Sequence, residues 1–456
     1  MSDSIQFTVR FDAEEEKVWK HAPFQIPEGV DQFHISIEYN DRINSNPMLT
    51  GGNTLDVGLF DPQGIESGSP GLRGWSGSVR TEITIDRDWA TPPYRSGEIQ
   101  PGEWNLLLGA YKTADVGLDA HVTVTLNTDH LRPEEPPIAG IEDLHRTALP
   151  EPPESGWYRG DLHMHTVYSD GDSYPHEVAA AVYEAGLDFY GITDHNRAQS
   201  PMPLVPHEDG WPVLVPGVEV TSYAGHFNVW GGDDTWYDFR DYSAKGQQAA
   251  VDAAHAGGAL VSLNHPKPFG PMWEHPEVTG FDCIEGWNGW WTGLNHIATG
   301  FWSDQLNEDT AEHWHVGVCG SDMHYMKEDG NPLVPVTPAN LGHPTLWIQT
   351  DDELNQESIL EAIRTGRVFM SEDPAGPMLF SQRDGENISI RVVGARDDVL
   401  MAVNRDGCAR AEAISSTDVT FVWPIADLNV NAGQYIRFEV MSSGGVMRAM
   451  GNPIWI

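Results

Sequence analysis

The sequence predicts an α/β protein in which a central parallel barrel lies between two β-rich regions. Apolar strand candidates alternate with helix candidates across residues 157–370. Fragments rich in His, Asp and Glu follow most of these strands. The two ends of the chain instead alternate apolar and polar residues with a period of two. In parallel α/β barrels the functional site lies at the C-terminal ends of the strands, so the polar fragments are expected to meet there.

Residues 1–128 are expected to form a β-sandwich or jelly-roll-like domain. Residues 33–39 and 121–126 alternate in the manner of half-buried strands, and Asn, Gly and Pro clusters mark turns between such strands. Four aromatic residues of this region could form a sugar-binding platform, but core packing is the favoured interpretation for them. They are Trp75, Trp89, Tyr94 and Trp104.

The barrel region, 157–370, contains helix candidates that have apolar positions at helical spacing. They cover 174–186, 244–256, 294–305 and 356–365. The strand candidates cover 187–193, 213–215, 260–263, 283–287 and 316–319, after a first strand that ends at Asp161-Leu162-His163. His176, in the first turn of the first helix, is expected to be exposed.

The barrel region is bordered by two segments of different character. Residues 129–156 are rich in proline and acid, which predicts a semi-rigid, exposed linker that can run along a neighbouring domain. Residues 371–456 return to alternating patterns, at 387–392 and 435–440, and are expected to form a small β domain packed on the barrel.

The fragment Asp161-Leu162-His163-Met164-His165 is the most informative stretch of the chain. Side chains two apart on an extended segment point to the same side, so His163 and His165 are expected to project together and form half of a metal site. One such pair is weak evidence alone. Five further fragments follow in order: 193–196, 217–219, 225–228, 264–266 and 320–324. The ligand types are His, Asp and Glu, which suit zinc, manganese or iron equally.

Taken together, the ordered fragments H-x-H, S-D-G, T-D-H, G-x-E, H, N-H-P and S-D-x-H resemble the PHP (polymerase and histidinol phosphatase) family of metal-dependent hydrolases. The resemblance spans about Trp157 to Phe369. The segment Gly225–Gly231 and the flanking β regions are similar to the carbaryl-hydrolase-like branch. The resemblance implies a distorted seven-stranded (β/α) barrel and two or three divalent metal ions; spacing alone does not distinguish seven strands from eight.

The resemblance also implies roles for individual residues. Glu219 matches a carboxylate that bridges two metals, and Asp194 is expected to orient a ligand or a metal-bound water. The full set of implied metal ligands is His163, His165, Asp170, His195, Glu219, His226, His265, Asp322 and His324. An alternative for Asp170 is a turn-forming role before Gly171.

Some residues near these fragments are candidates for substrate contacts. Arg197 and Lys267 could each hold a phosphate or carboxylate oxygen, although an ordinary surface charge is as good an interpretation. Proton transfer to the leaving group could come from His226, His324 or Asp194. Glu285 and Asn288 could line the pocket, and the neighbouring tryptophans could form an apolar wall, although core packing is more frequent for them. They are Trp287, Trp290 and Trp291.

Composition limits the partners. The chain has 456 residues, 68 acidic and 26 basic, for a formal net charge of −42. A surface of this sign repels polyanions, so nucleic acid is not an expected partner. No long apolar window or signal-like N-terminus is visible, so a cytoplasmic protein with no membrane partner is expected. Three scattered cysteines indicate neither disulfides nor a thiolate zinc site.

The function expected from these observations is metal-dependent hydrolysis of a small-molecule ester, with a metal-activated water as nucleophile. Phosphoester hydrolysis comes first, and carboxylic or carbamic ester hydrolysis is the alternative that the carbaryl-hydrolase-like features favour. A third hypothesis is a non-catalytic carbohydrate- or surface-binding protein. It requires a degenerate barrel, whereas every expected ligand position here holds a competent residue.

Overall fold

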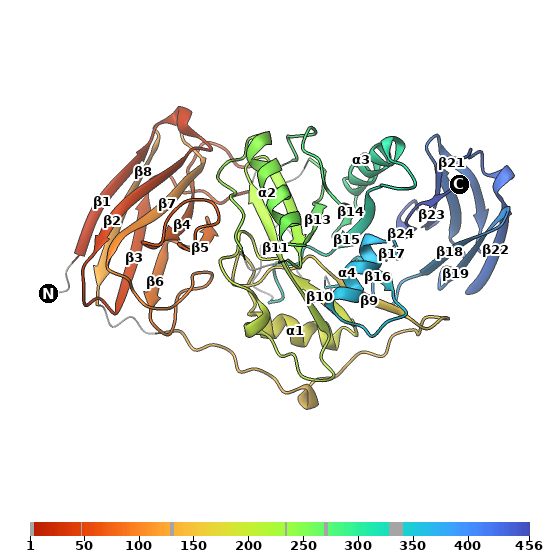
Figure 1. The fold of residues 1–456 in the computed structure, drawn as a ribbon, viewed down its shortest axis with the longest axis horizontal. Helices are drawn as coiled ribbons and strands as arrows, with labels where there is room; N and C mark the ends of the chain where they lie inside the picture. Colours follow the sequence, from red (N-terminus) through yellow and green to blue (C-terminus); the bar gives the residue numbers. More distant parts are fainter. Residues whose placement is uncertain (1–3, 47, 128–131, 233–234, 269–271, 328–340) are drawn as a thin grey trace.

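The structure is a computed structural model, and it describes residues 4–46, 48–127, 132–232, 235–268, 272–327 and 341–456. The molecule is elongated, with a β domain at the N-terminal end, a mixed α/β region in the middle and a second β region at the C-terminal end (Figure 1). No helix in these ranges is long and apolar enough to cross a membrane.

The N-terminal region consists of two four-stranded antiparallel sheets that share one core. Their orders are β1-β8-β3-β6 and β2-β7-β4-β5. The strands are β1 (Ser4–Phe11), β2 (Trp19–Ile26), β3 (Gln32–Tyr39), β4 (Thr54–Phe60), β5 (Leu72–Gly77), β6 (Glu82–Asp86), β7 (Gly102–Lys112) and β8 (Leu118–Leu126). Trp75, Tyr94 and Trp104 are buried, so core packing is confirmed for them; Trp89 is half-buried.

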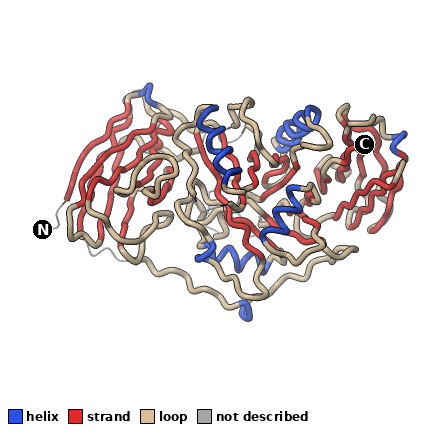
Figure 2. Tube along the Cα trace, in the orientation of Figure 1, coloured by secondary structure: helices blue, strands red, loops and turns tan. Residues whose placement is uncertain are grey.

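The central region carries the predicted alternation in part. Its strands are β9 (Trp157–Asp161), β10 (Phe189–Ile192), β11 (Val213–Ser222), β12 (Gly225–Trp230), β13 (Leu260–Leu263), β14 (Cys283–Asn288), β15 (Val316–Gly320), β16 (Thr345–Gln349) and β17 (Val368–Ser371). The helices are α1 (Pro175–Glu184), α2 (Ala244–Ala256), α3 (Asn295–Glu308) and α4 (Gln356–Arg364), which confirms the four predicted helices. Figure 2 shows how few helices accompany these strands.

The strands β9 to β15 follow one another in hydrogen-bonded order, and the two ends of the series meet. β9-β10-β11 and β13-β14-β15 are parallel, whereas β12 pairs antiparallel with both neighbours. β11 and β12 form a hairpin that sequence analysis did not anticipate. Beyond β9, Met164 forms a parallel bridge with Met323 beyond β15, and His165 N–H donates to the Met323 carbonyl. The segments that follow these two strands therefore lie side by side.

The C-terminal strands continue the sheet of the central region through β17. β17 pairs with β24 (Met447–Gly451), which continues through β23 (Tyr435–Met441) and β20 (Val399–Asn404) to β21 (Gly407–Ala413). The backbone N–H and C=O groups at this edge of β17 are therefore paired with those of β24. A three-stranded sheet of β18 (Met378–Asp384), β19 (Asn387–Val393) and β22 (Asp418–Pro424) completes the region, and β25 (Ile454–Trp455) pairs with β23.

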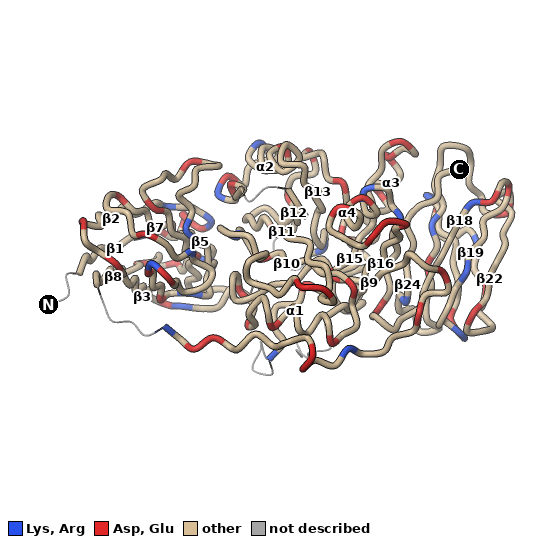
Figure 3. The backbone as a smooth tube through the Cα atoms, turned by 60° about the horizontal axis from the view of Figure 1, so that its bottom comes forward, with Lys and Arg blue, Asp and Glu red and all other residues tan. Residues whose placement is uncertain are grey.

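The described linker residues, 132–156, run along the outside of the central region (Figure 1 and Figure 3). Among these residues the structure has one short helix, the 3-10 turn Ile141–Asp143. Arg146 donates to the carbonyls of Gly186 and Leu187, just after α1. His176, expected to be exposed, is buried because the linker covers it: its Nε2 lies 3.1 Å from the Pro136 carbonyl oxygen.

Candidate metal centre

The two histidines after β9 enter the interior together, as their i, i+2 spacing predicts. Asp161, the last residue of β9, is fully buried and accepts hydrogen bonds from the backbone N–H of His163, Ser321 and Gly342. This carboxylate therefore ties the start of the His163 segment to the end of β15. The rings of His163 and His165 lie 5.3 Å apart, and both are buried.

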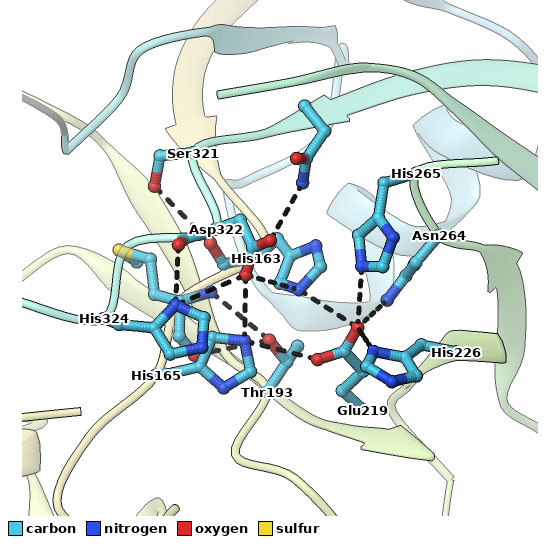
Figure 4. A network of polar contacts seen from close by, with 12 residues as sticks. His163, His165, Thr193, Glu219, His226, Asn264, His265, Ser321, Asp322 and His324 are labelled. Carbon is cyan, nitrogen blue, oxygen red and sulfur yellow. Dashed lines mark hydrogen bonds and ion pairs between the residues drawn. The ribbon is translucent and has the colours of Figure 1, made fainter. Parts of the chain in front are cut away.

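Glu219, on β11, is the hub of the site (Figure 4). Its Oε1 lies 3.2 Å from His226 Nδ1, 3.2 Å from His265 Nε2 and 3.5 Å from His163 Nε2. Its Oε2 lies 2.9 Å from His195 Nδ1 and 3.3 Å from His165 Nε2. One fully buried carboxylate thus faces imidazole groups through both of its oxygens.

Two further carboxylates, Asp322 and Asp170, face the histidines, and Asp170 contacts the remaining one, His324. Asp322 Oδ1 lies 3.3 Å from His163 Nε2 and 3.2 Å from His165 Nε2. Asp170 Oδ1 lies 3.4 Å from His195 Nε2 and 3.2 Å from His324 Nε2. Asp170 therefore faces the cluster, and a purely turn-forming role does not account for its position.

Three overlapping groups of these residues have ligand atoms within 4.8 Å of one another. They are His165, Asp170, His195 and His324; His163, His165, Glu219 and Asp322; and His195, Glu219 and His226. The structure therefore brings together eight of the nine ligands that the sequence implied. His265 is the ninth; it contacts Glu219 but belongs to none of the three groups.

The buried donor atoms fit divalent metal ions. His163 Nε2, His165 Nε2, His226 Nε2, Asp170 Oδ1 and Glu219 Oε2 are buried and have no hydrogen-bond partner among the described residues. Buried polar atoms left in this state are costly unless something else satisfies them. Imidazole nitrogens and carboxylate oxygens are the ligands that zinc, manganese and iron accept.

The pKa shifts follow the charges that the cluster brings together. Burial lowers the pKa of His165 to about 3, and the neighbouring His324 and His195 add to this effect. Burial alone would raise the pKa of Glu219, but His163, His195 and His226 outweigh it and hold the pKa well below its usual range. The site therefore favours ionised carboxylates, the form that binds metal.

A buried network behind the ligands holds them in place. His163 Nδ1 donates to Glu285 Oε1 at 2.9 Å, which leaves Nε2 facing Glu219 and Asp322. Glu285 Oε2 accepts from Asn288 Nδ2, which also donates to Asp322 Oδ2. Sequence analysis placed Glu285 and Asn288 near the pocket but did not assign them this positioning role.

Lys267 belongs to the same network and is not available as a free substrate-binding cation. Its Nζ lies 3.0 Å from the Asn288 carbonyl oxygen, 2.8 Å from Asn288 Oδ1 and 3.1 Å from Asn295 Oδ1. An ammonium group has three N–H donors, so all three are used. Burial lowers the pKa of Lys267.

Asp194 and Arg197 also lie behind the ligands. Asp194 accepts from Thr166 N–H, Thr166 Oγ1 and Ser169 Oγ, and Ser169 Oγ lies 3.2 Å from His165 Nδ1. This arrangement suits orientation of His165 better than proton transfer. Arg197 is buried and its Nε donates to the Gly217 carbonyl, so a role in binding the substrate stays a prediction.

The three tryptophans at the end of β14 and in the loop after it differ in burial. Trp287 is buried in the main core, as the core-packing interpretation expects, and the partly buried Trp291 packs against it. Trp290 is 52% exposed and lies 4.5 Å from the His343 ring.

Sequence analysis missed one aromatic neighbour of the site, because it comes from the N-terminal domain. The Trp75 ring lies 6.3 Å from the His195 ring in a perpendicular arrangement. These residues are far apart in the chain, and no local pattern links them.

Comparisons with known proteins returned structures only: no family model and no curated protein matches. One similar solved structure is a two-domain protein from Bacteroides vulgatus ATCC 8482 that contains a predicted PHP-like metal-dependent phosphoesterase. It has 19% identity and a TM-score of 0.41, over 68% of this chain and 99% of that one. Another, assigned as a metal-dependent phosphoesterase from Bifidobacterium adolescentis ATCC 15703, has 18% identity and a TM-score of 0.28, over 47% and 98%.

Proposed function

We propose that the chain is a metal-dependent hydrolase of the PHP type, with a distorted seven-stranded (β/α) barrel, that cleaves a phosphoester of a small molecule. The observation that carries this proposal is Glu219, whose two oxygens face members of all three ligand groups. A carboxylate in this position can be shared between metal ions. Two or three divalent ions bound by these groups would supply Lewis acidity and a water of lowered pKa.

The exposure of the ligands defines the side from which a substrate approaches. The side chains of Asp170, Asp322 and His324 are 34%, 24% and 20% exposed, whereas those of His163, His165 and Glu219 are almost fully buried. The scissile group is therefore held at the Asp170–Asp322–His324 edge. The deeper residues keep the ligand set in place.

Three residues were candidates for transferring a proton to the leaving group, and the geometry narrows the choice. Asp194 accepts three hydrogen bonds from Thr166 and Ser169, so it is poorly placed to exchange a proton. His226 presents Nδ1 to Glu219 and keeps Nε2 without a partner among the described residues. His324 lies on the exposed edge. We assign the transfer to one of these two imidazoles.

Carboxylic or carbamic ester hydrolysis, as in the carbaryl-hydrolase-like branch, is the second candidate. Lys267 is fully engaged and does not offer a cation to a phosphate, and the Nε of the buried Arg197 donates to a backbone carbonyl. The exposed Trp290 could contact an aromatic leaving group. A carbohydrate-binding scaffold is disfavoured, because three of the four platform aromatics are buried in the N-terminal domain.

A paired turnover assay tests the proposal. The manganese- or zinc-loaded protein is given a chromogenic phosphate ester and a naphthyl carbamate at equal concentrations. We expect preferential cleavage of the phosphate ester, and its loss together with bound metal in the double variant His163→Ala, His165→Ala. The exposed His313→Ala is the matched control and should retain both. Preferential carbamate cleavage would select the second candidate, and full activity of the double variant would exclude this metal centre.

A further inference from the structure

The N-terminal β domain is fused to the metal-binding region by a continuous core. Phe60, Leu72, Trp75 and Leu107 belong to the same buried cluster as the apolar residues of β11, β12 and β13. Trp19 stacks on Tyr223 at 4.8 Å with an interplanar angle of 4°, and Tyr223 donates to Asp56 Oδ2 at 2.9 Å. The domain is therefore held in a defined position relative to the site.

One edge of this domain reaches the ligands themselves. Trp75, on β5, packs edge-on against His195, and a Cβ on Gly77, the last residue of β5, would lie 3.1 Å from the Trp75 ring. Pro93 lines a small cavity together with Tyr168, Asp194 and Arg197. Two separate segments of the N-terminal domain thus lie against residues of the metal centre.

Arg80 lies in the sequence between these two segments, and it is the cation of this edge that is considered for the site. Its Nε donates to the Pro92 carbonyl at 3.3 Å, which fixes the side chain beside the Pro93 contact. No hydrogen bond from its two terminal nitrogens is found among the described residues, and the side chain is half-buried. Tyr94, Tyr174 at the start of α1 and Asp170, the most exposed metal-ligand candidate, are near enough to interact electrostatically with it, in decreasing order of strength.

Two other cations near the ligands, Lys267 and Arg197, are buried. Lys267 donates all of its protons to Asn288 and Asn295, and Arg197 donates to Gly217. An oxyanion held at the Asp170 edge would gain a charge-assisted, planar donor only if another guanidinium lies near that edge.

We infer that Arg80 of the N-terminal domain binds an anionic oxygen of the substrate at the metal centre, so that the two domains build one site for phosphate esters. This inference rests on the proposed function and deepens it, because it assigns the substrate a negative charge that neutral carboxylic and carbamic esters lack. Arg80 acts here as a substrate-binding residue and leaves metal binding to the deeper groups.

The test compares Arg80→Gln and Arg80→Lys with the exposed Arg87→Gln of the same domain, which lies in a surface ion pair with Asp31. Binding of inorganic phosphate to the metal-loaded proteins is measured by calorimetry, alongside metal content. Loss of a charge-assisted contact should weaken phosphate binding on the order of 10- to 100-fold in Arg80→Gln. Arg80→Lys should recover part of it, and Arg87→Gln should match the unmodified protein.

Turnover separates failure of this inference from failure of the proposed function. kcat/KM for a phosphate ester should fall in Arg80→Gln by a factor similar to that for phosphate binding, with metal content unchanged. Unchanged phosphate binding, or loss of metal from Arg80→Gln, would overturn the inference while leaving hydrolysis by the unmodified protein intact. Absence of metal-dependent ester hydrolysis in the unmodified protein would instead overturn the proposed function, whatever Arg80 does.

Discussion

Replacing Lys267 by methionine separates a positioning role from a substrate-binding role. Methionine fills similar space but donates no proton, so Asn288 O, Asn288 Oδ1 and Asn295 Oδ1 lose their ammonium partner. Each buried acceptor left unpaired costs about 1–3 kcal/mol. The desolvation of the ammonium, which burial imposes on Lys267, is relieved at the same time and offsets part of that cost. We therefore expect the free energy of unfolding to fall by about 3 kcal/mol.

The variant should also bind metal more weakly, because Asn288 donates to both Glu285 and Asp322 and would lose its anchor. Urea unfolding of the metal-free protein measures the stability, and competition with a chelating dye measures the metal affinity. Changes to residues that hold metal ligands in place typically cost 10- to 100-fold in metal affinity, that is about 1.4–2.7 kcal/mol. A variant with unchanged stability and metal affinity but weaker phosphate binding would refute the reasoning. It would indicate that Lys267 binds the substrate.

Three further predictions concern separate parts of the structure. Burial raises the pKa of Asp56 to about 7, so its contribution to stability is present at low pH and is lost as pH rises toward 7; Asp56→Asn should raise the melting temperature at pH 8 but not at pH 4. A Cβ on Gly320 would lie 2.3 Å from His163 Cβ, so Gly320→Ala should destabilise by about 1–3 kcal/mol in urea unfolding and reduce metal content. Burial lowers the pKa of His324, but carboxylates including Asp170 outweigh it and raise the pKa to about 10. Stability from that proton is present below about pH 6.5 and is lost toward pH 10, so thermal unfolding of metal-free protein should shift to lower temperature over this range, and much less with metal bound.

The local elements and the ligand set were predictable because each depends on short-range patterns. The four helices have apolar residues at helical spacing, and α2 has the predicted bounds Ala244–Ala256. Pairs such as His163 and His165 face the same way because they lie two residues apart on extended chain. Parallel strands bring most of these fragments to a common edge, whereas His226 reaches Glu219 from the antiparallel strand β12.

Features that depend on contacts between distant segments were not predictable in this way. The segment Gly225–Trp230 was interpreted as a ligand fragment, and its pairing with β11 and β13 shows that it is a strand. The sequence around Lys267 does not show that its side chain is buried beside Asn288 and Asn295. The burial of His176 depends on the linker that crosses it, and the approach of Trp75 to His195 depends on how two domains dock.

The central claim, that residues around Glu219 hold metal ions used for hydrolysis, is tested most directly by metal stoichiometry measured together with turnover. Mass spectrometry of dialysed protein should find two or three divalent ions per chain, and phosphate-ester cleavage should rise with occupancy. Glu219→Gln, which keeps the size but removes the shared charge, should bind fewer ions and lose turnover in proportion. A metal-free protein that cleaves the ester at the full rate, or a Glu219→Gln variant with unchanged stoichiometry and rate, would contradict the account.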